Sequence, residues 1–215
     1  MRRWFRFLKE TPCLTLLVVQ LAGVVLYPFM APSFVGRTVF SAFGIVVLTL
    51  TMRALRATPF FSWFSAVVFV PAVVLLIVSV VTENDALFPL SAGFEAALYF
   101  YAGVSMLAYM LKDEDVTVDE MFAIPAVFTL FAWAFAYLFV VIQELQPGAF
   151  GATRSWMDLL FLSFTTLSST GLSDILPATA HAKSVIMLEQ LAGIFYIAMV
   201  VTRLVSLRSY RKTQA

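Results

Sequence analysis

The sequence predicts an all-α membrane protein with six transmembrane helices. Of its 215 residues, 61% are hydrophobic and only 13% are charged, and the mean hydropathy is +0.93. Soluble domains carry about a quarter charged residues. Six apolar segments approach the roughly 20 residues that a helix needs to cross a bilayer. These segments cover residues 13–30, 35–52, 60–81, 90–111, 120–143 and 182–207.

The composition also argues against several classes of function. The net charge of +1 gives no indication of a nucleic-acid partner. The chain has one cysteine and one histidine, and its carboxylates are scattered along the sequence. A cysteine-rich metal site or a cluster of catalytic groups is therefore not expected. We expect no enzyme activity, no cofactor and no nucleic-acid partner, and we expect the lipid bilayer to surround the chain.

The segment between the last two spans has a different pattern, WMDLLFLSFTTLSSTGLSDILP over residues 156–177. Residues 157–166 predict a short apolar helix of nearly three turns, and residues 168–173 are small and rich in hydroxyl groups. Non-helical backbone at membrane depth is tolerated only where protein buries it or where it lines water. The segment therefore predicts a re-entrant pore loop between the fifth and sixth helices.

A pore loop of this composition is expected to bind a desolvated cation through its backbone carbonyl groups. Gly171 permits the positive φ that turns carbonyls inward. Ser173 must either adopt positive φ at a cost of roughly 1–2 kcal/mol, or the outer filter follows a different path, which we expect. Asp174 is expected to concentrate cations at the pore mouth or, alternatively, to bond to the end of the pore helix. The expected ion-binding residues are Ser169, Thr170, Gly171, Leu172 and Ser173, and K⁺ or Na⁺ at this filter are the only metal ions expected.

Four residues around the loop are expected to support the filter. Asp158 stands at the start of the short helix, where the helix dipole favours a negative charge. Thr165 and Thr166 are expected to buttress the filter rather than line it. Glu189 lies in the last span, where a carboxylate is costly unless it is paired. It is expected to bond to serine or threonine hydroxyls behind the filter, with Gln190 as the alternative partner.

The last span also contains the candidate gate. Gly193, in its middle, is expected to be a site of close helix packing. The residues that follow predict an apolar constriction that closes by dewetting. They are Tyr196, Ile197, Val200, Val201 and Leu204.

Two motifs in this part of the chain carry a resemblance to known proteins. Residues 165–177 resemble the pore loop of tetrameric potassium channels, TTxTTVGYGDxxP, with Leu172 in place of the tyrosine and Ser173 in place of the second glycine. The string TGLS also resembles the single-glycine filters of the Trk, Ktr and HKT potassium transporters. The segment MLEQLAGIFYIAMVVTRLVSL is similar to the inner helix of small bacterial ion channels. The resemblance covers roughly residues 121–207.

The resemblance implies a homotetramer around a central pore, because the chain carries a single loop. It also implies a hinge at Gly193, as the alternative to close helix packing there. It implies a cation channel that conducts K⁺ and excludes Na⁺ only moderately, in a bacterial inner membrane. A Trk/Ktr-like potassium transport protein and a non-conducting accessory channel subunit are the alternatives. The domain prediction is a peripheral region of four helices at 1–119, a pore domain at 120–207 and a short cytoplasmic tail at 208–215, with no soluble ligand-binding domain.

Basic residues predict the orientation of the chain. Those near the N-terminus, those after the second span and those at the C-terminal end fall on one side of the membrane, so both termini are expected in the cytoplasm. The fourth span carries no arginine or lysine, so strong voltage gating is not expected. Its single charge, Glu95, is expected to have a structural role, to pair with the pore domain or to line a water crevice. Trp63, Trp133 and Trp156 are expected at membrane interfaces.

Overall fold

The computed structural model describes residues 11–30, 34–56, 63–82, 87–112 and 118–213. These residues form seven α-helices and no β-strand, which confirms the predicted all-α class for the described part of the chain. Each predicted span is helical over its described residues, and the short helix before the hydroxyl-rich loop is present. The helices are α2 (Pro12–Met30), α3 (Phe34–Arg56), α4 (Trp63–Thr82), α5 (Phe88–Lys112), α6 (Val118–Leu145), α7 (Trp156–Leu167) and α8 (Ala180–Thr213).

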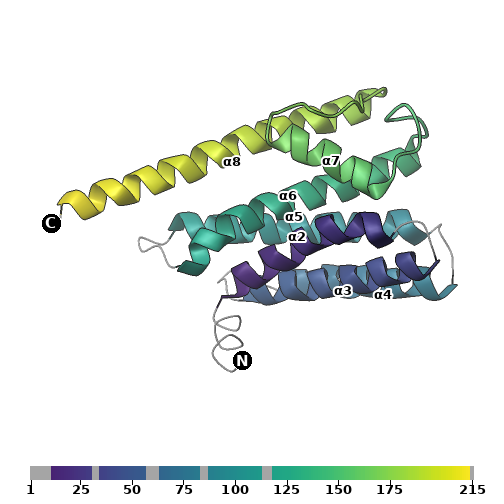
Figure 1. Ribbon diagram of the computed structural model, residues 1–215, viewed down its shortest axis with the longest axis horizontal. Helices are drawn as coiled ribbons and strands as arrows, with labels where there is room; N and C mark the ends of the chain where they lie inside the picture. The colour runs from purple at the N-terminus through teal and green to yellow at the C-terminus, as the bar shows by residue number, and fades with distance from the viewer. Residues whose placement is uncertain (1–10, 31–33, 57–62, 83–86, 113–117, 214–215) are drawn as a thin grey trace.

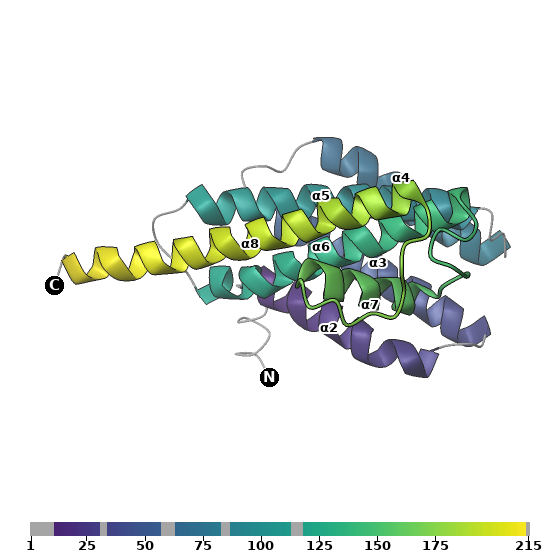
Figure 2. The same ribbon diagram turned by 90° about the horizontal axis from the view of Figure 1, so that it is seen from above.

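The helices run roughly along one direction and form layers. In Figure 1, α8 and α7 lie at the top, α6, α5 and α2 lie in the middle, and α3 and α4 lie below. Helix α8 continues beyond the rest of the bundle toward the C-terminus in both views (Figures 1 and 2). It ends at Thr213, so most of the predicted tail at 208–215 continues the last helix.

Helix α6 is the centre of the bundle, because it contacts α2, α5, α7 and α8. A helix that is apolar on every side is suited to such a buried place. Small residues let its neighbours approach closely, and aromatic residues fill the space between them. Ala126, Ala132, Ala134, Ala136, Trp133 and Phe139 have no exposed surface. The outer helix of the predicted pore domain is thus enclosed by helices of both predicted domains.

Among the described residues, four helices are long and apolar enough to cross a membrane by length and composition: α2, α5, α6 and α8. The part of α4 described with its side chains gives an apolar stretch over Ser65–Val78. Helix α3 carries Arg53 and Arg56 in its last turn. The chain is a helical membrane protein, and within its described residues four of the six predicted spans meet these criteria.

Helix α2 begins against the first turn of α6. The Cys13 N–H donates a hydrogen bond of 3.1 Å to Asp119 Oδ1. The first N–H groups of a helix have no partner within it, so a carboxylate stabilises this end. The sequence alone does not show that the start of α2 lies beside Asp119.

Helix α7 begins with a capping box. The Asp158 N–H donates 3.2 Å to the Ser155 hydroxyl, and the Ser155 N–H donates 3.0 Å to Asp158 Oδ2. This arrangement satisfies two N–H groups that the helix itself leaves without partners. Asp158 therefore stabilises the start of the short helix, in the position that the sequence predicted.

Replacing Ser155 by alanine should remove this cap and lower the stability of the purified protein by about 1 kcal/mol. Ser184→Ala is the matched control, because the Ser184 hydroxyl only donates to the Ala180 carbonyl within its own helix. Thermal unfolding in detergent would measure both variants. Equal midpoints for the two would contradict a stabilising role of the cap.

Candidate functional site

The candidate site is the non-helical segment that follows α7. The helix ends at Leu167, and Ser168 and Ser169 form a turn. Ser169 has φ +58° and Gly171 has φ +63°. The two left-handed residues are separated by Thr170, so the backbone changes hand from one residue to the next. Gly171 adopts the positive φ predicted for it.

The end of α7 holds this segment through one backbone oxygen. The N–H groups of Thr170 and Gly171 both donate to the Thr165 carbonyl, over 2.9 and 3.1 Å. In a trans peptide unit the N–H and C=O bonds point in opposite directions. The carbonyls of Ser169 and Thr170 share these two peptide units and therefore point away from α7. Ser169, Thr170 and Gly171 are exposed in the single chain, so these carbonyl oxygens face open space.

Side-chain hydroxyls strengthen the same turn. The Ser168 hydroxyl donates 2.6 Å to the Phe164 carbonyl and lies 3.0 Å from the Thr170 hydroxyl. The Thr165 hydroxyl donates 2.9 Å to the Leu162 carbonyl, and Thr165 and Thr166 are buried. Both threonines are buried beside the turn, and their role as filter supports stays a prediction.

Sequence reasoning did not find the backbone conformation of Ser169. A serine in the left-handed region costs roughly 1–2 kcal/mol, and among the described residues Ser169 is the one non-glycine residue with positive φ. The conformation results from the hydrogen bonds on either side of it. The Ser169 N–H donates 2.9 Å to the Thr166 carbonyl, and the next two N–H groups return to Thr165. The serine at position 169 gives no sign of this left-handed conformation in the sequence.

The outer part of the segment follows the path that the sequence analysis favoured. Ser173 does not adopt positive φ, and its hydroxyl accepts a hydrogen bond of 3.1 Å from the Ile175 N–H. Ile175 is buried, whereas the Leu172 side chain is 75% exposed and Asp174 is exposed. The Ala178 N–H donates 2.8 Å to the Ala149 carbonyl and joins the segment to the loop before α7. Leu172 and Ser173 therefore do not continue the left-handed conformation of the inner turn.

Glu189 of α8 reaches α7 behind the filter segment. Its side chain is fully buried, and the Ser163 hydroxyl of α7 bonds to Glu189 Oε1. The same hydroxyl lies 2.8 Å from the Ala132 carbonyl of α6. Ser163 therefore links three helices at one point. The predicted contact with a hydroxyl is present, and the alternative partner, Gln190, is exposed.

One turn further along α8, Gly193 touches the end of α7. A Cβ added to Gly193 would stand 1.9 Å from the Leu167 carbonyl oxygen and 2.8 Å from its carbonyl carbon. Only glycine allows such an approach of two backbones. The close-packing role of Gly193 therefore has direct support, and a hinge at this position stays a prediction.

The candidate constriction divides into two faces of α8. Tyr196 and Val200 are buried against the bundle, and the Tyr196 hydroxyl bonds to the Ile124 carbonyl of α6. Residues that pack inside one chain do not face an axis shared by several chains, so these two depart from the predicted constriction in this conformation. Ile197, Val201 and Leu204 are exposed, and the predicted constriction rests on them.

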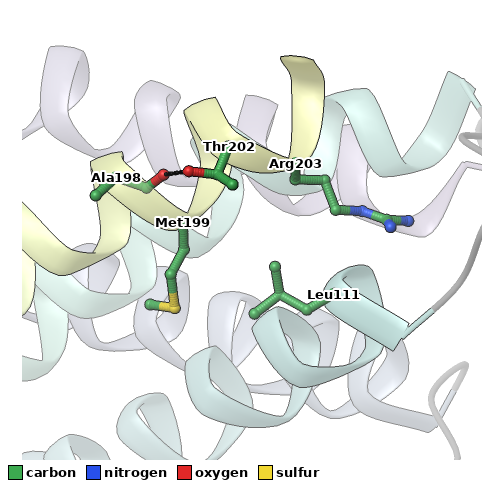
Figure 3. A pocket seen from close by; sticks show the side chains of 5 residues that line it. All are labelled: Leu111, Ala198, Met199, Thr202 and Arg203. Carbon is green, nitrogen blue, oxygen red and sulfur yellow. Dashed lines mark hydrogen bonds between the residues drawn. The ribbon is translucent and has the colours of Figure 1, made fainter. Parts of the chain in front are cut away.

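An open pocket of about 400 Å³ lies between the last turn of α5 and the part of α8 that follows Gly193. Figure 3 shows the side chains of Met199 and Leu111 pointing into it, with Arg203 farther along α8. Its other lining residues are Ala198 and Thr202, and the Thr202 hydroxyl donates 2.8 Å to the Ala198 carbonyl. None of the five lining residues is a carboxylate, histidine or cysteine. The segment after α7 therefore remains the candidate functional site.

The fold and this site define a class: a helical membrane protein in which a short helix and an exposed carbonyl-rich turn pack against two membrane-length helices. Comparison with protein families names the class more closely. Residues 124–209 match the family described as "Ion channel". The match supports the predicted resemblance to an ion-channel family of potassium-channel type, and it covers α7, the turn and most of α6 and α8. Searches of curated proteins and of solved structures found no match.

Replacing Gly193 by alanine should destabilise the protein by about 1–3 kcal/mol, because the new methyl group overlaps the backbone of Leu167. Gly44→Ala is the matched control in α3. A Cβ there would meet Leu76 Cδ2 at 3.4 Å, an ordinary contact, and the change should stabilise the helix slightly. Thermal unfolding would rank the two variants. A midpoint for Gly193→Ala at or above that of the wild type would show that the close approach is absent.

Proposed function

We propose that the protein is a homotetrameric cation channel that conducts K⁺ and excludes Na⁺ only moderately. The observation that carries the proposal is the direction of the Ser169 and Thr170 carbonyls, which point away from α7 toward open space. Rings of backbone carbonyls replace the hydration shell of a monovalent cation in channel filters. The ion-channel match of residues 124–209 supports the same reading.

The proposal requires several copies of the chain, because one chain presents the turn on its surface and encloses nothing. An apolar face continues from the turn along α7 and α8. Its members include Phe161, Leu188, Leu191, Ile194, Phe195 and Val201, all exposed in the single chain. Exposed apolar patches of this kind mark interfaces with protein or lipid. Four copies that meet along this face would bring four sets of carbonyls to one axis.

Weak selectivity is proposed from the outer half of the turn. Leu172 has no hydroxyl group with which to bond to a neighbouring pore helix, and its side chain is largely exposed. Ser173 uses its hydroxyl for the Ile175 N–H. The carbonyls of Ser169, Thr170 and Gly171 would form a short inner filter, and the outer part would be wider. Asp174 is exposed beyond it, where its charge would attract cations.

The proposed gate is the exposed face of α8 below Gly193, formed by Ile197, Val201 and Leu204 from each chain. An apolar ring at this place would stop ions by losing water. We further propose six spans in a bacterial inner membrane, with both termini in the cytoplasm as the basic residues predict. Under this proposal, ion passage needs neither an enzyme reaction nor a cofactor.

Flux of K⁺ into liposomes that contain the purified protein would test the proposal. Gly171→Ala should lower the flux at least tenfold, because alanine resists positive φ by roughly 1–2 kcal/mol in every chain of the ring. Gly148→Ala is a matched control. Gly148 also has positive φ, and an added Cβ there, as at Gly171, meets nothing within 4 Å. Gly148 lies before α7, outside the turn, so the K⁺ flux of Gly148→Ala should stay near that of the wild type.

Bi-ionic reversal potentials on the same liposomes would separate the candidates. A channel of the proposed kind gives a K⁺ over Na⁺ preference well short of that of a GYG filter and no chloride current. Chloride permeation would overturn the cation filter. A slow, saturating flux would favour a Trk/Ktr-like transport protein, and no flux would favour an accessory subunit.

A further inference from the structure

A cluster of aromatic side chains surrounds the first turn of α7. It consists of Tyr27 from α2, Tyr99 from α5, Trp133 and Tyr137 from α6, and Trp156, the first residue of α7; we call it the aromatic cluster. The ring of Trp156 lies 5.1 Å from Trp133, 5.5 Å from Tyr27 and 5.7 Å from Tyr137, measured between ring centroids. Aromatic pairs at such distances contribute beyond their burial. Rings from two other helices, α2 and α6, therefore contact the start of α7, and Tyr99 of α5 packs against Trp133 and Tyr137.

The sequence analysis expected Trp133 and Trp156 at membrane interfaces, and this is wrong. Trp133 is fully buried and Trp156 is 6% exposed, inside the protein. Tryptophans of membrane proteins are enriched at the interfaces, but Trp133 lies in the middle of α6, and neighbouring helices cover both rings.

The aromatic cluster is connected to a buried carboxyl group. Glu95 of α5 is buried, and its Oε1 accepts a hydrogen bond of 3.0 Å from the Ser91 hydroxyl. The Tyr137 hydroxyl lies close enough to Glu95 to interact with it electrostatically. Tyr99, one turn after Glu95, lies 5.8 Å from Tyr137 between ring centroids. A buried carboxyl favours polar neighbours, and Tyr137 is the neighbour that connects Glu95 to the ring of Trp156.

Helix α2 reaches the same turn directly. The Tyr27 hydroxyl is hydrogen-bonded to the backbone of Met157 and to the side chain of Ser155. These groups belong to the first turn of α7 and to its capping residue, where helix N–H groups lack intrahelical partners. Tyr27 therefore joins a peripheral helix to the pore helix by ring contact and by hydrogen bond.

We propose that Glu95 and Tyr27 are positioning residues for ion selection, because through the aromatic cluster they hold the first turn of α7 in place. Helix α7 has 12 residues and is about 18 Å long, and the Ser169 and Thr170 carbonyls follow directly at its other end. A change in its tilt moves those carbonyls relative to the shared axis. The inference rests on the proposed channel function and gives the peripheral helices α2 and α5 a role in it.

Tyr27→Phe and Tyr137→Phe test the proposal, because each keeps the ring and removes one hydroxyl. Each should change the K⁺ over Na⁺ permeability ratio at least about twofold, since one hydrogen bond is worth about a fivefold change in an equilibrium. Tyr101→Phe makes the same chemical change on α5 outside the aromatic cluster and should leave the ratio unchanged. Bi-ionic reversal potentials would be measured on particles that elute like the wild type.

Substitutions of Glu95 give a second test of the same permeability ratio. Glu95→Gln keeps an acceptor for Ser91 and Tyr137 and should retain the wild-type ratio, whereas Glu95→Leu fills the space without an acceptor and should shift it. Unchanged ratios in Tyr27→Phe, Tyr137→Phe and Glu95→Leu would overturn the proposal while the channel function stands. A wild-type protein that passes no cation would instead overturn the proposed function itself.

Discussion

The Thr165 carbonyl is the point on which the candidate site depends. It accepts the N–H groups of Thr170 and Gly171 at the end of α7, and these two bonds turn the opposite carbonyls outward. Ser169 and Gly171 both have positive φ, so the backbone enters the left-handed region twice within this short segment. One of the two residues is a glycine, which takes this conformation freely, and the other is held by its neighbours. Under the proposed function, these carbonyl oxygens would replace the water molecules around a cation.

The rest of the pore region keeps α7 in place at both ends. At its start, the capping box of Ser155 and Asp158 and the ring of Trp156 fix the first turn. Toward its end, Ser163 bonds to Glu189, and Leu167 meets Gly193 without an intervening side chain. A short helix in isolation is marginal, so these contacts with α6 and α8 supply the order that its length does not.

Much of the fold could be predicted, because apolar segments of membrane length need few partners to be recognised. All six apolar segments and the short helix are present, and Gly171 has the predicted φ. What depends on packing could not be predicted. The left-handed Ser169 results from hydrogen bonds to α7, Asp119 caps α2 because α2 begins beside it, and the burial of Tyr196 results from the rotation of α8 about its axis. Glu95 was identified by its charge alone, and its partner Tyr137 appears only when α5 and α6 are packed together.

Imaging the purified particle in K⁺ by electron cryomicroscopy would test the central claim most directly. The account predicts four chains around one axis, with ion density between the Ser169 and Thr170 carbonyls of all four. A single chain in the particle, or an assembly whose turns face lipid rather than the axis, would contradict it.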